Sequence, residues 1–391
     1  MSKKLLLICN VEFQKRMKGS HHRIYSLVES LQKIGIDVTF FYIGTDKSII
    51  EKNPLGLKIV ANNITNNVII ATFFKILNKI NNNKNRDKNI IKSDSKNIKV
   101  LEKHLKKYTY DFIIFEHLET SYMLNIVKKI SNAITIIDTH DLKFQRYEKF
   151  KEFGINSNIL KITKDEEMKI LSKFDYVIAI QYEEAELLKK YLNNSVITMM
   201  HGIENKVFDE FKYIVKEKKK LDIVFFGSTA KFNVDSVEWF IKHIWNDYRI
   251  KENFNFHIYG LICNKLLNMP KDIFIHGLVN DIKEVYINAD IVINPIRFGS
   301  GLKIKNVEAM SYGIPLITTS IGIQGMKKIS QDEVIIANTT EKFLSEILKL
   351  IEDDKRILLS NNSKQYAKDN FSQNICFEEF RSILQGVELD E

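Results

Sequence analysis

Short runs of hydrophobic and often β-branched residues alternate along this chain with segments whose apolar positions recur at helical spacing. In the first half, strands are predicted at residues 5–9, 38–43, 111–115, 133–137, 176–180 and 195–198. The first helix follows a loop through residues 18–20 and ends near Gly35. Alternation of this kind predicts a parallel sheet that is covered by helices on both faces.

The same alternation begins again in the second half. Strands are predicted at residues 222–226, 254–259, 290–294, 315–318 and 333–336, and a helix runs from about Val234 to Trp245. A charged stretch at 205–220 separates the halves and predicts an interdomain linker. We therefore predict an α/β protein with two Rossmann-like domains that face each other across a cleft, at residues 1–203 and 204–370. In such sheets ligands bind at the carboxyl ends of the strands.

Composition agrees with two folded domains. The chain has 391 residues, of which 45% are hydrophobic and 27% charged, values typical of a globular protein. No apolar run reaches the roughly 18 residues that span a bilayer, and the apolar stretch after Met1 is too short for a signal peptide. Cys9, Cys263 and Cys376 lie far apart without metal-type spacing, which predicts core residues in a reducing compartment. We expect a cytoplasmic protein.

The net charge of +9 is concentrated in one segment. Residues 75–107 contain eleven Lys or Arg against three acids, so this segment alone carries +8. Such a local excess disfavours nucleic acid as a partner, because nucleic-acid proteins usually spread basic residues over a face. Phe73, Leu77 and Ile80 fall at helical spacing between lysines, so residues 73–107 are a candidate for contact with an anionic membrane surface. The alternative is a solvated loop.

The segment from Asn294 to Pro315 is the most informative part of the sequence. A strand ends at Asn294, a loop with Gly299 and Gly301 follows, and a helix is predicted to begin near Leu302. Glycines let the backbone approach a ligand closely, and the free amides of a helix start favour a phosphate. We therefore expect an anion-binding site at this loop.

Side chains around this loop fit the same ligand. Ser300 adds a hydroxyl donor, while Arg297, Lys303 and Lys305 add positive charge that would oppose the helix dipole unless a polyanion were bound. Glu308 follows in an otherwise apolar turn, where a carboxylate can accept from two neighbouring hydroxyls, as the acidic ribose ligand of dinucleotide-binding folds does. The alternative is a helix-start loop with surface lysines and a salt-bridged glutamate.

Residues 294–315 resemble the donor-binding signature of family-four glycosyltransferases, in the branch with a Gly-rich approach, a basic-x-Lys pair and Glu-Ala-Met. Three further segments are similar to the same branch, at residues 198–203, 225–240 and 276–290. Residues 366–384 resemble the C-terminal helix that crosses back to the first domain in this family, which assigns that role to residues 371–391. The resemblance is strong over residues 198–384 and loose before them, and it implies the GT-B fold.

The resemblance implies a metal-independent, anomer-retaining transfer of a sugar from a nucleoside diphosphate sugar to a glycan, lipid-linked or other acceptor, without a cofactor. Glu308 would hold the ribose hydroxyls, and Lys303 and Lys305, with the amides near Ser300 and Gly301, would bind the diphosphate. The leaving diphosphate gains charge in the transition state, and preorganised donors stabilise that charge. A basic cytoplasmic transferase of this kind fits the assembly of cell-envelope polysaccharides.

Two positions depart from the family pattern. Ser300 stands where many members have a Glu that contacts the donor sugar. After Gly227, Ser228 and Asn233 stand where many members have Arg and Lys, and Lys231 is a candidate to replace part of that charge, the alternative being a solvated loop lysine. These departures leave open two other functions, a non-catalytic nucleotide-binding partner subunit and a nucleotide-sugar epimerase or phosphorylase on the same fold.

Loops of the first half supply fewer candidates. Residues 138–141 resemble the family's His-Asp turn, which predicts that His140 lies near the reacting sugar as a hydrogen-bond donor. The alternative is a strand-end histidine that neighbouring aspartates satisfy. Gly19, Ser20 and Arg23, with two histidines between them, lie at a helix start and are candidates to contact the donor diphosphate or the acceptor. Ordinary helix capping with surface charge is the alternative.

Overall fold

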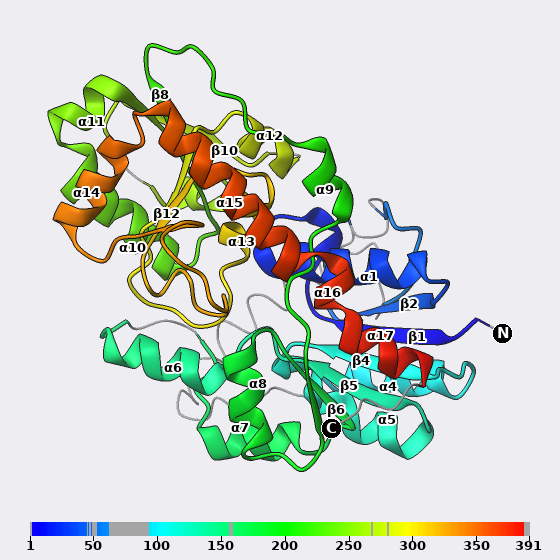
Figure 1. The fold of residues 1–391 in the computed structure, drawn as a ribbon. Helices are drawn as coiled ribbons and strands as arrows, with labels where there is room; N and C mark the ends of the chain where they lie inside the picture. Colours follow the sequence, from blue (N-terminus) through cyan, green and yellow to red (C-terminus); the bar gives the residue numbers. More distant parts are fainter. Residues whose placement is uncertain are drawn as a thin grey trace. The chain divides into compact units, whose positions relative to one another are not determined.

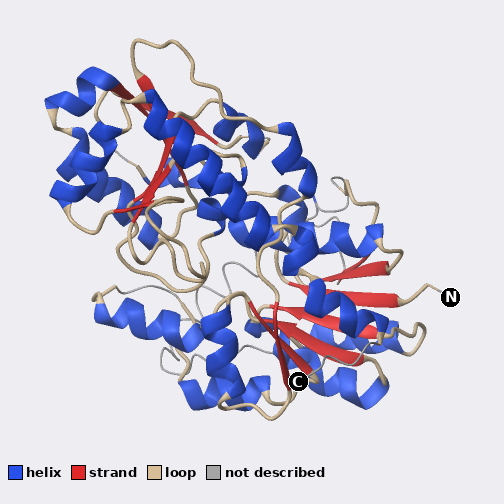
Figure 2. Ribbon diagram, in the orientation of Figure 1, coloured by secondary structure: helices blue, strands red, loops and turns tan. Residues whose placement is uncertain are grey.

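The computed structural model describes residues 2–44, 46, 48, 53–61, 94–155, 159–266, 269–279 and 281–386. These residues form two parallel sheets with their helices (Figures 1 and 2). By packing, the chain divides into two compact units. The first unit comprises residues 1–15, 28–178 and 187–196, and the second comprises residues 16–27, 179–186 and 197–391.

The first sheet has seven parallel strands in the order β3-β2-β1-β4-β5-β6-β7. The strands are β1 (Lys4–Cys9), β2 (Asp37–Tyr42), β3 (Lys58–Ala61), β4 (Phe112–Glu116), β5 (Ile134–Asp138), β6 (Tyr176–Ala179) and β7 (Ser195–Thr198). In register, Leu6 lies opposite Thr39 on one side and Ile113 on the other. Strand β3 was not predicted; it is only four residues long, and none of its residues is fully buried.

Helices of the first sheet occupy the positions that the alternation predicts. They are α1 (Gly19–Lys33), α4 (Ser95–Leu105), α5 (Leu124–Ile130), α6 (Lys143–Glu152), α7 (Lys164–Leu171) and α8 (Tyr182–Lys189), with short 3-10 turns at Phe13–Lys15 and Leu118–Met123. Helix α1 confirms the predicted first helix and ends at Lys33. Gly35 follows it and has a left-handed conformation, with φ 82°. Glycine adopts this conformation without a steric cost.

The basic segment at residues 73–107 is described only from residue 94 onward. There it forms α4, whose start is capped by the Asp94 side chain accepting from the backbone amides of Lys96 and Asn97. Leu101 and Leu105 are buried while the helix's lysines are exposed. The predicted apolar stripe at Phe73, Leu77 and Ile80 lies outside the described residues, so membrane contact stays a prediction. None of the described helices has the length and apolar character needed to cross a membrane.

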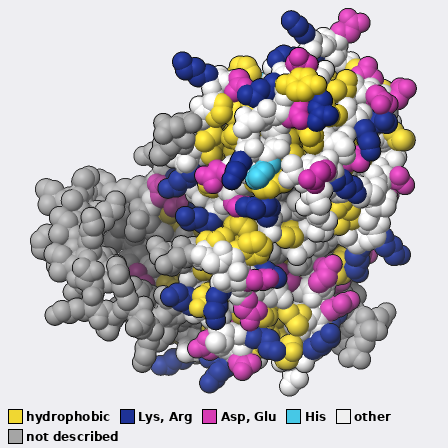
Figure 3. Space-filling model, turned by 90° about the vertical axis from the view of Figure 1, so that its left-hand side faces the viewer, with side chains coloured by type: hydrophobic (Ala, Val, Ile, Leu, Met, Phe, Trp, Pro, Cys, Tyr) yellow, Lys and Arg dark blue, Asp and Glu magenta, His cyan; other side chains and the backbone are white. Residues whose placement is uncertain are grey.

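Basic and acidic side chains are interspersed over the described part of the face drawn in Figure 3. Surface ion pairs of this kind include Lys349 with Glu346 and Lys355 with Glu352 in the second unit. This distribution on the drawn face agrees with the expectation that the net charge is local to one segment.

The second sheet has six parallel strands in the order β10-β9-β8-β11-β12-β13. The strands are β8 (Leu221–Phe226), β9 (Phe254–Tyr259), β10 (Ile273–Gly277), β11 (Ile291–Asn294), β12 (Leu316–Thr318) and β13 (Ile335–Ile336). The helices are α9 (Asn205–Glu210), α10 (Lys231–Phe240), α11 (Tyr248–Asn253), α12 (Ile282–Ile287), α13 (Ile304–Ser311), α14 (Thr340–Lys349) and α15 (Asp353–Phe371). A π-helical turn (Ile241–Trp245) extends α10 to the predicted end at Trp245, and a 3-10 turn (Leu261–Lys265) follows β9.

The C-terminal region differs from the single helix predicted over residues 366–384. It consists of α15, α16 (Gln373–Cys376) and α17 (Glu378–Gln385), because Ser372 is extended and interrupts the helix. The extended residue pairs with the turn at residues 198–203: the Ile203 amide donates to the carbonyl O of Phe371 at 2.7 Å, and the Gln373 amide donates to the carbonyl O of Ile203 at 2.9 Å. The predicted domain limits at residues 203 and 370 remain a prediction.

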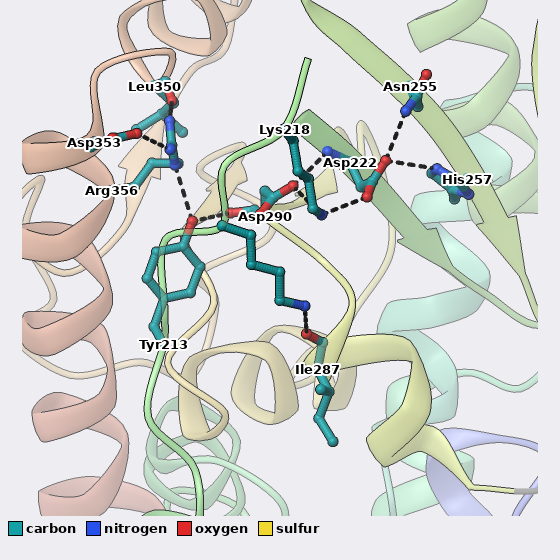
Figure 4. Close-up of polar contacts among 11 residues, drawn as sticks. Tyr213, Lys218, Asp222, Asn255, His257, Ile287, Asp290, Leu350, Asp353 and Arg356 are labelled. Atoms are coloured by element: carbon teal, nitrogen blue, oxygen red, sulfur yellow. Dashed lines mark hydrogen bonds and ion pairs between the residues drawn. The ribbon is translucent and has the colours of Figure 1, made fainter. Parts of the chain in front are cut away.

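The chain between α9 and β8, predicted to be a linker, is packed against the second sheet (Figure 4). Lys218 Nζ lies 2.7 Å from Asp222 Oδ2 and 2.8 Å from Asp290 Oδ2. The Tyr213 hydroxyl donates to the carbonyl O of Asp290 at 3.3 Å and accepts from Arg356 Nε at 3.0 Å. These partners lie on β8, directly before β11 and on α15, so the segment belongs to the second unit and is not a free tether.

Phe240 lies at the centre of the second unit's core, with its ring centroid 4.8 Å from that of Phe256 and 6.1 Å from that of Phe343. We expect Phe240→Ala to lower the free energy of unfolding of this unit by about 3–5 kcal/mol, because it removes buried apolar surface and leaves a cavity. Urea unfolding followed by tryptophan fluorescence measures this unit, since both tryptophans, Trp239 and Trp245, lie in it. Tyr248→Ala, at a residue 68% exposed, is the control and should change the value by less than about 0.5 kcal/mol. Equal effects of the two substitutions would contradict this account of the core.

Candidate functional site

The loop that precedes α13 has the backbone that its glycine pair predicts. Gly299 has φ 137° and Gly301 has φ 71°, both in the region that favours glycine. Helix α13 begins at Ile304, two residues later than predicted, because Lys303 at the N-cap has φ −88° and ψ 88° and is not yet helical. The predicted anion loop therefore connects the carboxyl end of β11 to the start of α13.

Lys303 and Lys305 both point away from bulk solvent. Lys303 is 7% exposed, and its Nζ donates to the carbonyl O of Gly301 at 2.5 Å. Lys305 Nζ donates to Asn233 Oδ1 at 2.6 Å and lies 4.2 Å from the centroid of the Phe225 ring. Loss of hydration, together with the neighbouring Lys303, lowers the pKa of Lys305 to about 7. Among the described residues, no carboxylate lies within 4.0 Å of this ammonium group.

Asn233 connects Lys305 to the loop after β8. Its Nδ2 donates to the carbonyl O and to Oγ of Ser228, each at 3.1 Å, while its Oδ1 accepts from Lys305. Asn233 is buried in the first turn of α10, and Gly227 and Ser228 lie directly at the end of β8. A neutral amide in this chain therefore holds a lysine ammonium beside the turn where many family members have two cations.

Glu308 is buried on α13 and held by two partners. His22 Nδ1 lies 2.9 Å from Oε1, and the Tyr286 hydroxyl shares its one hydrogen between Oε2 at 3.3 Å and the carbonyl O of Lys305 at 3.2 Å. Burial has the largest single effect and would raise the pKa of Glu308, but the charge and hydrogen bond of His22, together with His201 and the hydrogen bond from Tyr286, hold that pKa below its usual range. Burial lowers the pKa of the nearby His201 to about 4, so His201 is neutral near pH 7. The Glu308 carboxylate is therefore ionised near pH 7.

Glu308 and His22 line a cavity of about 430 Å³ whose lining residues all belong to the second unit. Small-molecule sites typically have volumes of roughly 300–1,000 Å³. The wall combines charged groups with apolar and aromatic ones, among them Arg16, Tyr25, Phe226, Leu278, Val279 and Tyr312. A cavity of this size, with an ionised carboxylate in its wall, suits a nucleoside.

The other predicted donor residues lie around the same loops but face different neighbours. Arg297 forms a two-point ion pair with Asp235 of α10, one contact being 2.9 Å between Nε and Oδ2. Lys231 is the exposed first residue of α10. Ser300 is partly buried, and Leu302 is 7% exposed. The charge of Arg297 is thus already balanced, whereas that of Lys305 is not.

The first turn of α1 belongs to the second unit and lies against the start of α13. A Cβ placed on Gly19 would lie 3.2 Å from Ile304 Cδ1, so glycine permits this close approach. Ser20 is partly buried and Arg23 is 1% exposed. His22, between them, contacts Glu308, so the structure joins this predicted segment to the predicted ribose carboxylate.

His140 lies in the first unit, in the turn after β5. Its Nε2 lies 2.6 Å from Glu116 Oε2, and its amide donates to Asp138 Oδ1 at 3.3 Å. The ring packs against His117 with centroids 3.8 Å apart, and both histidines have positive φ, 59° and 70°. Non-glycine residues held in this conformation cost roughly 1–3 kcal/mol each and often cluster at functional sites.

Within the part of the chain that the structure describes, Glu116, Asp138 and His140 form a group that could hold a metal ion. One ligand atom of each lies within 4.8 Å of the others, and both carboxylates are fully buried. Carboxylate and imidazole ligands suit several divalent ions. The same contacts also provide hydrogen-bond partners for a His140 that acts without a metal ion, and Glu116 then fixes the orientation of its ring.

Lys305 should destabilise the free protein near neutral pH, because its pKa is about 7 when folded and near 10.5 when unfolded. Between these values the unfolded chain binds more protons, so stability rises with pH. We expect Lys305→Met to raise the free energy of unfolding by roughly 1–3 kcal/mol at pH 7, and this gain to shrink toward pH 10. Denaturant titration at several pH values measures it, with the exposed Lys342→Met as the control. A destabilised Lys305→Met protein at pH 7 would contradict the prediction.

Known proteins that are similar to this chain include a protein family and a curated bacterial protein. Residues 220–353 match the family described as Glycosyl transferases group 1. An uncharacterized 44.6 kDa protein in the cps region of Klebsiella pneumoniae is 25% identical over 226 residues, which cover 53% of this chain and 55% of the relative. The match therefore spans about half the length of that relative.

Solved structures match over nearly the whole chain. Sucrose-phosphate synthase from Thermosynechococcus elongatus has a TM-score of 0.71 at 14% identity, covering 98% of each chain. The pneumococcal O-GlcNAc transferase GtfA in complex with UDP and GlcNAc has 0.68 at 12%, covering 100% of each. Anabaena HepE in complex with UDP and glucose has 0.67 at 11%, covering 98% of this chain and 100% of its own. The chain therefore has the GT-B fold with two Rossmann-like sheets, and its residues 220–353 are similar to the Glycosyl transferases group 1 family.

Proposed function

We propose that this chain is a glycosyltransferase that takes a sugar from a nucleoside diphosphate sugar and passes it to a glycan, lipid-linked or other acceptor. One observation carries the proposal: α13 brings an ionised carboxylate to the wall of a nucleoside-sized cavity and two lysines to its own start. Glu308 accepts hydrogen bonds from the ribose hydroxyls. Lys303 and Lys305 bind the diphosphate together with the loop amides.

The lysines act on the leaving group. As the bond between the sugar and the diphosphate breaks, negative charge grows on the diphosphate oxygens, and fixed donors that face this charge lower the barrier. Each such group is typically worth roughly 3–4 kcal/mol in the transition state. Lys305 has no carboxylate partner within 4.0 Å among the described residues, so a bound diphosphate supplies the opposite charge. Because these cations balance the diphosphate, we propose transfer without a metal ion and, as in the family that the sequence resembles, with retention at the anomeric carbon.

The neighbours narrow the candidate substrates. HepE and GtfA are solved in complex with UDP, and the Klebsiella relative lies in a cps region, so UDP-sugars and cell-envelope polysaccharide assembly are the first candidates. In this proposal His140 donates a hydrogen bond to the sugar, and the segment at Gly19, Ser20 and Arg23 contacts the diphosphate or the acceptor. The chain acts in the cytoplasm, and residues 73–107 contact an anionic membrane surface where the acceptor is lipid-linked.

Ser300 favours a second candidate function. It occupies the position where many members of the family that the sequence resembles have a glutamate that contacts the donor sugar. The second candidate function is therefore nucleotide binding without transfer of the sugar. Such a chain would serve as a partner subunit of another transferase. Epimerisation of the nucleotide sugar is a further reaction for the same fold, and analysis of products formed without an acceptor separates it from transfer.

A thermal-shift screen with the diphosphates of uridine, guanosine and thymidine tests the donor site. A ligand that binds only the folded state at a hundredfold excess over Kd stabilises it by about 2.7 kcal/mol. We expect one base to raise the Tm of the wild type and to leave Glu308→Ala unchanged, because the ribose hydroxyls lose their acceptor. Glu341→Ala, an exposed glutamate on α14, should shift as the wild type does. Equal shifts of Glu308→Ala and the wild type would place the nucleotide elsewhere.

Chelation tests the proposed independence from metal. We expect the Kd for the binding nucleoside diphosphate to change by less than about twofold between EDTA and added Mg²⁺ or Mn²⁺, because lysines supply the positive charge. The measurement is isothermal titration calorimetry on chelated and reloaded protein. Binding that is lost on chelation and restored by Mn²⁺ in the wild type, but not in Glu116→Gln, would assign a metal to the Glu116, Asp138 and His140 cluster instead.

A further inference from the structure

The ring of His22 contacts a hydrogen-bond acceptor through each of its two nitrogens. Nδ1 lies 2.9 Å from Glu308 Oε1, and Nε2 lies 2.6 Å from the carbonyl O of Arg16. His22 is in the first turn of α1, and Arg16 is in the preceding loop with φ 49°. The His22 side chain is 13% exposed and that of Glu308 is 7% exposed, so water competes little for either contact.

These two contacts determine how many protons the ring carries. A carbonyl oxygen only accepts, so Nε2 carries a hydrogen. An ionised carboxylate also only accepts, so Nδ1 must carry a hydrogen as well. A ring with both hydrogens is the charged imidazolium. If the ring lost one proton, a nitrogen lone pair would face either the Glu308 oxygen or the carbonyl O of Arg16, and that contact would become repulsive.

The charges around the pair favour the same state. Burial alone would lower the pKa of His22, but the Glu308 carboxylate outweighs burial and raises it. Arg16 opposes the imidazolium weakly, whereas its carbonyl favours it. Among the described residues, other titratable groups near the pair include His201, Tyr286, Tyr312, Arg23 and Lys305. The same cavity is also lined by the charged residues Glu204, Lys206, Glu210, Asp281 and Lys283. His201 is neutral near pH 7, and Tyr286 donates to Glu308 without carrying charge.

We propose that His22 is a positioning residue whose imidazolium holds the Glu308 carboxylate in the orientation that binds the ribose. The inference rests on the proposed donor site. A carboxylate has about four acceptor sites, two on each oxygen. His22 occupies one site on Oε1 and Tyr286 one on Oε2, which leaves one site on each oxygen for the two ribose hydroxyls. Without the imidazolium, the side chain loses its fixed rotamer, and binding must restore it.

The proposal predicts a dependence on pH with a definite sign. His22 has a raised pKa in the folded protein, so its contribution is complete below its usual pKa of 6.5 and is lost as pH rises through the raised value. Above that value, the wild type and a variant without the imidazolium should bind donor alike. The ligand and Lys305 titrate in the wild type and in the variant alike. The ratio of the variant's Kd to the wild-type Kd at each pH therefore isolates the effect of His22.

The first test does not need a donor. Histidine side-chain NMR of the free wild type, with the His22 signal assigned by its loss in His22→Gln, measures the pKa directly. We expect a value above 6.5 in the wild type and a lower value in Glu308→Gln, where the amide replaces the carboxylate. A wild-type pKa at or below 6.5, or one that Glu308→Gln leaves unchanged, would overturn the ion pair whatever the protein binds. If His22→Gln fails to fold, the titration of the wild type against Glu308→Gln still decides.

The second test measures the Kd of the nucleoside diphosphate that the thermal-shift screen identifies, for the wild type and His22→Gln between pH 6 and pH 9. We expect His22→Gln to bind about tenfold more weakly at pH 6, and the ratio to fall toward one by pH 9. His243→Gln, at an exposed histidine on the π-helical turn, should give a ratio near one throughout. A ratio that stays constant with pH would show a merely structural role and overturn the proposal. If no nucleoside diphosphate binds the wild type, the proposed function fails, and the NMR titration alone judges the ion pair.

Discussion

One short helix, α13, carries opposite charges out of bulk water, and the arrangement of the second unit around it follows from that constraint. Glu308 is buried and ionised, and Lys305, three residues earlier, has an ammonium group whose nearest acceptor is a neutral amide. A buried charge is costly unless it is paired or hydrogen-bonded. The first turn of α1 places His22 beside Glu308. Helix α12 contributes Tyr286, and the loop before it forms part of the cavity wall. Helix α10 places Asn233 beside Lys305. The charge of the carboxylate is thus balanced by His22, while the lysine keeps an unbalanced charge that an anion can balance.

The departures from the family pattern make physical sense together. Where the family that the sequence resembles often has two cations after the first strand of its donor domain, this chain has Ser228 and Asn233, and both belong to the hydrogen-bond chain that ends at Lys305. One lysine from α13 therefore stands at the turn in place of two cations from the loop. Arg297, which the sequence offers as a further cation, is balanced by Asp235. Positive charge at this loop is consequently concentrated on Lys303 and Lys305, and the loop's glycines let a ligand reach them.

The local pattern of apolar residues and glycines was sufficient to predict most strands and loops of the fold. Apolar runs predicted β1 and β8 to within one residue, alternation of apolar and polar residues predicted β9, and the glycine pair predicted the loop before α13. Strand β10 was missed, because it is an edge strand whose Phe274 and Ile275 are exposed and which lacks a buried apolar pattern. The break at Ser372 was missed because the pairing with Ile203, far away in the sequence, causes it.

The site residues divide in the same way: some were predicted from the local sequence, and others depend on contacts between distant parts of the chain. Glu308, Lys303 and Lys305 were identified because their spacing on one segment is itself the signal. Tyr286 and the link between Asn233 and Lys305 carry no local signal, since they join residues 22 and 72 positions apart. His22 fell within a segment that the sequence marked, but its partner on α13 was visible only in the folded chain. The segment between α9 and β8 was predicted to be a free linker because the partners of Lys218, Asp222 on β8 and Asp290 directly before β11, are found only in the folded chain.

Consumption of a nucleotide sugar by the purified chain tests the central claim most directly. The protein is incubated with a panel of UDP-, GDP- and dTDP-sugars without acceptor, and nucleoside diphosphate and free sugar are measured by mass spectrometry. The account predicts slow release of diphosphate and sugar in equal amounts from one donor, with water in place of the acceptor, and at least a hundredfold less from Lys305→Met, because one stabilising group of the leaving diphosphate is lost. Tight binding of a nucleoside diphosphate without release from any sugar donor, alone or with candidate glycan acceptors, would contradict a transferase and support a nucleotide-binding partner subunit.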